Sequence, residues 1–203
     1  MHRFSAVAFL FFLVAFFSSG FASAQNMLVN PNFDTDLAGW GGNGWWDQED
    51  AFGSPLSGSA TWINDWPSAG SIYEDQCVPV PSDFKAFDLA GYVYIPTGQP
   101  VIGGRTYIYL AFYSEANCDQ PMEILRTDNF VDLGVWELST MTGWVPVGAV
   151  SARVGLANYK DAPGDFQVHH DSIFFGRSAE WVFADGFESE DLAAWQVMTV
   201  VMR

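Results

Sequence analysis

The sequence has 203 residues, of which 24 are acidic and 8 are lysine or arginine, so its formal net charge is −16 at pH 7. This charge argues against binding to nucleic acid or to an anionic membrane, because few cations are present to neutralise phosphate groups. It is compatible with a neutral ligand and with calcium, which prefers carboxylate and carbonyl oxygens. Solubility is the simpler explanation for most of the charge.

The first 24 residues are predicted to be a signal peptide. His2 and Arg3 form a short basic start, residues 6–17 are continuously apolar, and Ala22-Ser23-Ala24 predicts cleavage after Ala24. The apolar run is too short for a transmembrane helix, which needs about 20 apolar residues. We therefore expect export without membrane insertion, to the periplasm, the cell surface or the medium.

Residues 25–177 are expected to form one all-β domain. Aromatic residues make up 17% of the chain and charged residues 16%, with 19 glycines and 10 prolines, which favours an all-β extracellular domain. Strand-like segments occur about every ten residues without a helical period, so the pattern predicts an antiparallel β-sandwich. The expected strands are 27–29, 59–64, 70–80, 87–95, 105–114, 121–131, 135–139, 149–157 and 166–175.

Alternation within two of these strands predicts which side chains face outward. The strand at 105–114 would direct Thr106, Ile108, Leu110 and Phe112 to the core, and Arg105, Tyr107, Tyr109, Ala111 and Tyr113 outward. In the strand at 87–95, Tyr92 and Tyr94 lie on the face opposite Leu89 and Val93.

The two cysteines, Cys77 and Cys118, are predicted to form a disulfide, because the chain is expected to be exported. Two free thiols are the alternative. The bond would close a loop of about forty residues and contribute about 3–4 kcal/mol by restricting the unfolded chain.

The opening stretch from Leu28 to Trp40 combines Asn-Pro-Asn turn chemistry with a final Gly-Trp pair. It resembles the start of carbohydrate-binding modules of families four, nine and twenty-two, with Asn32 replacing their usual glycine and Asp34 their usual glutamate. Three later segments also resemble these families: Gln76 to Val80, Val135 to Ser139 and His170 to Phe175. The resemblance extends to about Gly176 and implies a jelly roll of the galactose-binding-domain-like type.

The resemblance also implies a structural calcium ion. The acidic residue of the opening motif corresponds to Asp34, and that of the last strand corresponds to Asp171. Calcium needs six to eight oxygen ligands, and backbone carbonyls would have to complete the shell. The alternative is that Asp34 caps a turn and that Asp171 accepts ordinary hydrogen bonds.

Sugar binding in such modules rests on aromatic rings that stack on pyranose faces and on polar groups that bind hydroxyls. Tyr92, Tyr94, Arg105, Tyr107 and Tyr109 are predicted to line one concave sheet, with a rim formed by Trp45, Trp46, Trp62 and Trp66. For each ring the alternative is a role in the core. Trp40 and Trp136 are assigned to the core.

Known catalytic motifs of hydrolases, metalloproteases and nucleotide-binding enzymes are missing from the sequence. His169 and His170 are neighbours on a strand and point to opposite faces, so we expect two separate surface histidines rather than a metal site. The predicted function is non-catalytic recognition of a polysaccharide or glycan by a monomer. The alternatives are an extracellular adhesion or structural protein and, less favoured, a glycoside hydrolase.

Residues 178–203 are predicted to be a flexible or loosely docked tail. Phe187-Glu188 and Trp195 echo Phe33-Asp34 and Trp40 of the opening stretch, with one residue inserted. The segment also resembles a tail found at the ends of many secreted bacterial proteins.

Overall fold

The computed structural model describes residues 25–100, 103–127, 131 and 134–178. The predicted signal peptide, and the predicted tail apart from Ser178, lie outside these residues. All regular structure in the described part consists of strands: β1 (Trp45–Asp47), β2 (Ser59–Asn64), β3 (Gly70–Pro79), β4 (Ala86–Tyr94), β5 (Arg105–Tyr113), β6 (Pro121–Arg126), β7 (Glu137–Trp144), β8 (Ser151–Lys160) and β9 (Phe166–Arg177). None of the described residues belongs to a helix that could cross a bilayer.

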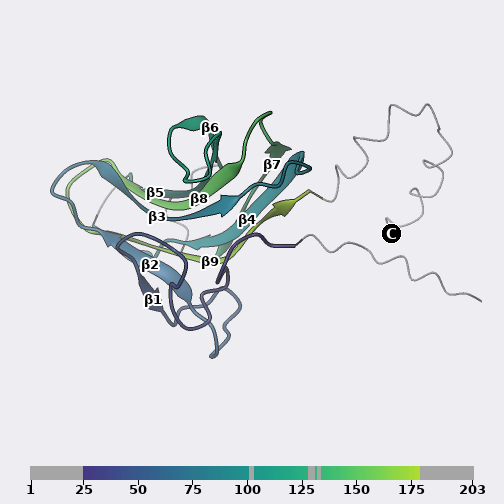
Figure 1. The fold of residues 1–203 in the computed structure, drawn as a ribbon. Coiled ribbons are helices and arrows are strands. Elements are labelled where there is room, and N and C mark those ends of the chain that lie inside the picture. Colours follow the sequence, from purple (N-terminus) through teal and green to yellow (C-terminus); the bar gives the residue numbers. More distant parts are fainter. Residues whose placement is uncertain (1–24, 101–102, 128–130, 132–133, 179–203) are drawn as a thin grey trace, which may run out of the picture.

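The strands form two antiparallel sheets that pack face to face (Figure 1). The five-stranded sheet has the order β1-β2-β9-β4-β7, and the four-stranded sheet has the order β3-β8-β5-β6. In Figure 1 the four-stranded sheet is the upper layer, and its strands bend so that the outer face is concave. The predicted antiparallel β-sandwich is confirmed.

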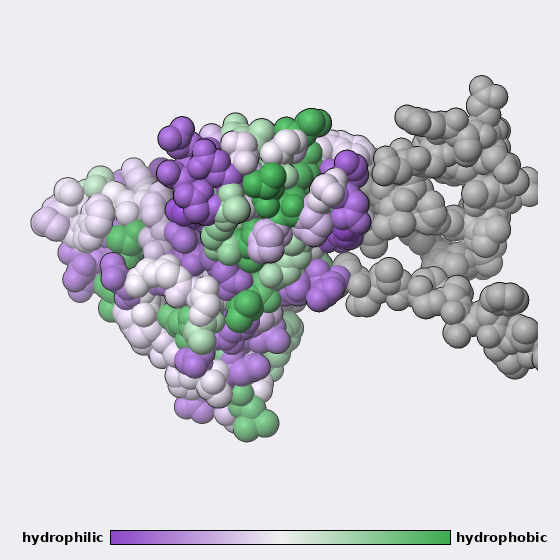
Figure 2. Space-filling view, in the orientation of Figure 1, coloured by the Kyte–Doolittle hydropathy of each residue, from purple (hydrophilic) through white to green (hydrophobic). Residues whose placement is uncertain are grey.

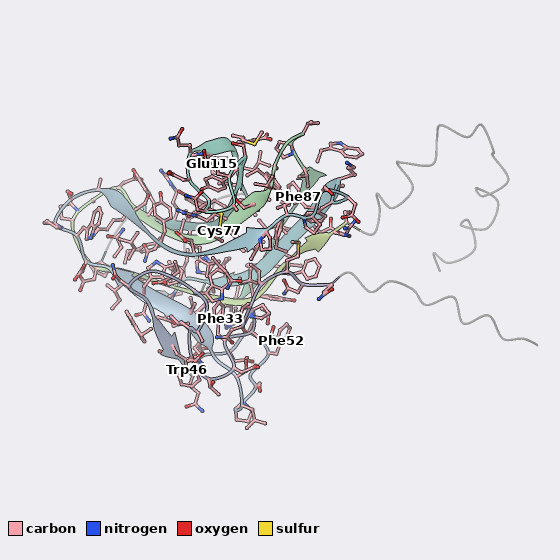
Figure 3. All side chains as sticks on the ribbon, viewed as in Figure 1. Phe33, Trp46, Phe52, Cys77, Phe87 and Glu115 are labelled. Carbon is pink, nitrogen blue, oxygen red and sulfur yellow. A yellow bond between two sulfur atoms is a disulfide. The ribbon has the colours of Figure 1, made fainter. Side chains whose placement is uncertain are left out.

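The core lies between the sheets and follows the predicted alternation. Ile108, Leu110 and Phe112 of β5 are fully buried, while Ala111 and Tyr113 pack with Cys118 on the opposite side of the strand. Each apolar side chain of this size stabilises the fold by about 1.5–3 kcal/mol when fully buried. Phe87 lies in the same core, between the two layers (Figure 3).

The opening stretch runs beside the last strand, although residues 27–29 do not form the separate strand that we predicted. The Met27 N–H donates to the Phe175 carbonyl, and the Ile173 N–H donates to the Pro31 carbonyl. The Asn26 side chain supplies two further bonds to β9. Positive φ angles at Asn30 and Phe33 turn the chain away, and Phe33 is fully buried.

The disulfide between Cys77 and Cys118 is present, as predicted. It joins the outer side of β3 to the loop that follows β5, on the upper side of the molecule in Figure 3. It therefore fixes one end of the four-stranded sheet's outer face.

The prediction of two surface histidines was wrong. His169 points to the outer side of β9 and His170 to the core, yet both are buried. The Thr61 hydroxyl lies 2.7 Å from His169 Nδ1, and the Thr106 hydroxyl lies 2.8 Å from His170 Nε2. Burial lowers the pKa of His169 to about 4 and that of His170 to about 3, so both rings are neutral at pH 7.

Candidate functional site

The outer face of the four-stranded sheet carries a row of tyrosines contributed by three strands. β5 supplies Tyr107, Tyr109 and Tyr113, and the antiparallel register places Tyr73 of β3 and Tyr159 of β8 on the same side. Arg105, Arg126, Arg153 and Asp75 share this side of the sheet. We call this set the tyrosine face.

Tyr109 is the centre of the tyrosine face, and its ring lies over the backbone of Gly155. The residue opposite Tyr109 on β8 is Gly155, and a Cβ atom added there would collide with the Tyr109 ring. The Tyr73 ring meets the Tyr109 ring edge-on, with centroids 5.4 Å apart and an interplanar angle of 84°. The two rings form an aromatic corner whose outer member, Tyr73, is 43% exposed.

The polar neighbours of Tyr109 keep its hydroxyl protonated and oriented. Burial raises its pKa, and the nearby Asp75 carboxylate raises it further. The Tyr109 hydroxyl lies 3.5 Å from Asp75 Oδ2. Asp75 also forms an ion pair with Arg153 at 3.8 Å, and the Arg153 side chain donates to the Cys118 carbonyl.

Arginine side chains cover two other rings of the tyrosine face. The Arg105 guanidinium lies 3.9 Å from the centroid of the Tyr159 ring, and the Arg126 guanidinium lies 5.6 Å from that of Tyr107. Tyr107 itself is only 9% exposed, and Tyr113 only 5%. Tyr73 and Tyr109 are therefore the rings best placed to meet a ligand, with arginines beside them as hydrogen-bond donors.

Tyr92 and Tyr94 do not belong to this face, although the sequence predicted one shared sheet. They lie on β4 of the five-stranded sheet and point to the opposite outer side of the molecule. The Tyr92 ring packs edge-on against Phe52 at 5.0 Å, and Phe52 lies on the lower side in Figure 3. β4 and β5 follow each other in sequence but join different sheets, which alternation within a strand cannot reveal.

The predicted rim tryptophans are dispersed. Trp62 is 1% exposed and stacks on His170 in the core. Trp46 is partly buried and donates from Nε1 to the Phe33 carbonyl at 2.6 Å. Trp45 on β1 is 42% exposed and Trp66 is 49% exposed, and only Trp66 lies next to β3.

The two tryptophans assigned to the core are both only partly buried. Trp40 packs against the core and contacts Phe33. Trp136 instead contacts Tyr94 and His169, two side chains on the outer side of the five-stranded sheet. It precedes β7 and therefore covers that sheet from outside.

Asp171 accepts hydrogen bonds from backbone N–H groups. Its Oδ2 accepts from Ala51 at 3.0 Å, and its Oδ1 accepts from Ser172 at 2.5 Å. Burial raises its pKa to about 6. The neighbouring Asp50 accepts hydrogen bonds in the same way from the backbone N–H groups of Phe52 and Ser54. Both carboxylates thus bind backbone N–H groups of the protein.

Asp34 is exposed, and the described residues contain no group of three or more acidic, histidine or cysteine side chains that could hold a metal. These residues thus do not by themselves make a calcium shell, which needs six or more oxygens. The structural calcium stays a prediction. Thermal unfolding with calcium, and again after chelation, measures it directly.

Sequence reasoning missed Tyr73, Asp75, Arg153 and Gly155 as members of the site. Each lies on β3 or β8, far in sequence from Tyr109. The available signal was Gly155 within a strand, because an interior glycine often marks close approach of another group.

Figure 2 shows hydrophilic residues gathered at the top of the view, where Figure 1 places β6 and its loop. A more hydrophobic stretch lies beside them, towards β7. The upper side of the molecule is therefore mixed in character.

No protein-family model matches the sequence, and no curated protein matches it either. Several solved structures share the fold. A family 61 carbohydrate-binding module in complex with β-1,4-galactotriose has a TM-score of 0.52 and 13% identity, over 76% of this chain and 100% of the module.

Two larger proteins contain a similar domain. The enzymatically active domain of bacteriophage CBA120 tailspike protein 4 gives a TM-score of 0.56 at 14% identity, over 74% of this chain and 21% of the tailspike chain. An arabinose-bound family 51 α-L-arabinofuranosidase gives 0.58 at 14% identity, over 74% of this chain and 26% of the enzyme. At these identities the likeness shows the fold alone: a jelly-roll sandwich of the carbohydrate-binding-module type, as predicted.

Proposed function

We propose that the chain is an exported, non-catalytic module that binds a polysaccharide or glycan on the tyrosine face. The observation that carries this proposal is the Tyr109 ring, which occupies the space above Gly155 on a concave sheet, beside the partly exposed Tyr73. The glycine leaves room for the Tyr109 ring to lie close to the backbone, and Tyr73, which is 43% exposed, extends the aromatic surface beside it.

The chemistry of this face suits a pyranose chain. One side of a pyranose ring is lined by C–H groups and stacks on an aromatic ring, while hydroxyls project from its rim. Stacking on Tyr109 and Tyr73 would supply apolar contact. Asp75 would accept hydrogen bonds from sugar hydroxyls, and the arginines would donate to sugar oxygens.

The fold supports the same proposal without establishing it. The family 61 module that shares the sandwich was crystallised with β-1,4-galactotriose, so this architecture can carry an oligosaccharide site. Fold alone does not fix function, and the proposal therefore stands on the tyrosine face.

The proposal is tested by retention of the mature protein on immobilised or insoluble polysaccharides. Tyr109→Ala should weaken binding at least about tenfold, which corresponds to about 1.4 kcal/mol. Tyr92→Ala is the matched control, because it removes a partly exposed tyrosine from the opposite sheet and should leave retention unchanged.

Two results would count against this function. Equal losses in both variants would show that retention does not depend on the tyrosine face. A folded wild-type protein that no polysaccharide retains would favour the adhesion or structural function instead.

A further inference from the structure

A pocket opens at the edge of the sandwich, where β3 borders the loop that precedes β1. Its volume is about 340 Å³, within the range of small-molecule sites. The lining residues are Asn43, Trp62, Trp66, Ser71, Ile72, Tyr73, Glu74 and Asp75. The pocket is thus built from one edge strand, one loop and two tryptophans.

Glu74 is the acidic group built into this pocket. It points inward from β3 and is only 3% exposed. Its carboxylate accepts a hydrogen bond from the Gly44 N–H, and a Cβ at Gly42 or Gly44 would collide with it. Burial raises the pKa of Glu74, and the hydrogen bonds from Gly44 and Asn43 lower it in part. The glycine loop therefore holds a buried carboxyl beside an open pocket.

Backbone pairing keeps this loop in place. The Gly41 N–H donates to the Asp75 carbonyl at 2.7 Å, and the Asp75 N–H donates to the Gly41 carbonyl at 2.8 Å. The loop is thereby fixed to the edge of β3, so the position of the Glu74 carboxyl does not depend on a bound ligand.

Two tryptophans supply apolar wall and a hydrogen-bond donor. The Trp66 indole lies against Gly70, where a Cβ would be 3.0 Å from Cε3, and nearly half of Trp66 remains exposed. Trp62 is buried, and its Nε1–H has no hydrogen-bond partner within the described part of the chain. A buried donor without a partner is costly, so a ligand or water oxygen that reached it would be favoured.

We infer that this edge pocket binds a single neutral sugar unit at the end of a glycan chain. Glu74 accepts hydrogen bonds from its hydroxyls and Trp66 provides the stacking wall. An anionic sugar is disfavoured because Glu74 and Asp75 would repel it. The choice of a glycan rests on the proposed function, since Tyr73 and Asp75 belong both to the pocket and to the tyrosine face. A chain lying on that face would reach the pocket with its terminal residue.

The test uses the free sugars D-glucose, D-galactose, D-mannose, D-xylose and L-arabinose as probes. The indole N–H resonances of the mature, ¹⁵N-labelled protein are followed by NMR during titration with each sugar. At least one sugar should shift the Trp62 and Trp66 resonances saturably. Trp66→Ala should weaken that binding at least about tenfold.

Two further variants complete the test. Trp45→Ala is the matched control, because Trp45 is similarly exposed but lies on the other sheet, and it should bind as the wild type does. Trp66→Ala should stay folded, because the Lys160 ammonium binds the backbone carbonyl of Trp66 rather than its ring. Glu74→Gln keeps a carbonyl acceptor for Gly44 and should still weaken sugar binding.

The inference is overturned if none of the five sugars shifts the Trp62 or Trp66 resonance, or if Trp66→Ala and Trp45→Ala bind equally. This failure is distinct from failure of the proposed function. Tyr109→Ala should weaken retention on polysaccharide at least about tenfold while leaving the free-sugar shifts intact, because Tyr109 does not line the pocket.

Discussion

The two outer faces of the sandwich both carry aromatic rings, but they support those rings differently. On the tyrosine face, Tyr109 lies over Gly155 and has Asp75 and Arg153 as charged neighbours. On the outer face of the five-stranded sheet, Tyr94 leans on Trp136 and His169, and Tyr92 meets Phe52 edge-on. The first arrangement surrounds its central ring with charged groups, and the second packs its rings against other aromatic side chains.

The neighbouring residues extend this difference. Leu138, opposite Tyr92 on β7, is 51% exposed, and Phe52 is 67% exposed. His169 is buried and neutral. A ligand rich in hydroxyls finds charged hydrogen-bonding partners on the tyrosine face and mainly apolar ones beside Tyr92. The number of aromatic residues on a sheet is thus a poor guide to sugar binding, whereas the residue beneath each ring is informative.

The largest expected effect concerns the disulfide, which ties down only the tyrosine face. Replacing both Cys77 and Cys118 by alanine should lower the free energy of unfolding by about 3–4 kcal/mol, because the unfolded chain regains the entropy of the closed loop. Urea unfolding measures the change. Reduction of the wild type should reproduce it, and a loss below about 1 kcal/mol would show that loop closure contributes little.

The next effect tests the support of the Tyr109 ring. Gly155→Ala places a methyl group where the ring lies, so Tyr109 must lift from the sheet at a cost of about 1–3 kcal/mol. We expect polysaccharide retention to fall at least about tenfold while the far-ultraviolet spectrum stays that of a β-protein.

The matched control for this variant is Ala157→Gly, also on β8 but opposite Tyr107. It should cost stability without comparable loss of binding. Retention that follows stability alone in both variants would mean that the position of the Tyr109 ring over Gly155 has no special role in binding.

Acid should destabilise the fold through the five-stranded sheet. The pKa values of His169 and His170 are lowered to about 4 and about 3, so below their unfolded pKa of about 6.5 the unfolded chain binds protons that the native protein does not. Asp171 opposes this loss of stability, because its pKa is raised to about 6 in the native protein. Between about pH 6 and its unfolded pKa near 4, the native protein binds a proton on Asp171 that the unfolded chain does not bind.

Two histidines outweigh Asp171, so the fold should lose stability between pH 6 and 4 by at most about 1.4 kcal/mol per pH unit, since the raised pKa of Glu74 also opposes the histidines. Thermal unfolding across this window should show the loss, and Asp171→Asn should steepen it. The Tyr109 hydroxyl stays protonated throughout, because its pKa is raised. Tyr109 should therefore contribute no change in polysaccharide retention across this window.

The sequence was sufficient for the sandwich and for the alternation within β5, because Ile108, Leu110 and Phe112 alternate with outward residues in a period that only a strand provides. It was insufficient for the sheet to which each strand belongs. Tyr92 and Tyr109 were therefore placed on one surface, while Tyr73 and Gly155 were not connected with Tyr109. The pairing of β3 and β8 with β5 is decided by packing across the whole domain, and no local pattern encodes it.

The smallest expected effect concerns the arginines that distinguish the tyrosine face from its opposite. Arg126 lies over the Tyr107 ring, an exposed contact of a kind worth about 0.5–1 kcal/mol. Arg126→Ala should weaken polysaccharide retention about two- to fivefold, since a donor is lost while the Tyr109 ring remains. Arg177→Ala is the control, because Arg177 pairs with Asp83 outside the tyrosine face. Affinity electrophoresis resolves differences of this size. Equal retention of the two variants would show that the aromatic rings alone recognise the polysaccharide, and that Arg126 serves only to hold the Tyr107 ring in place.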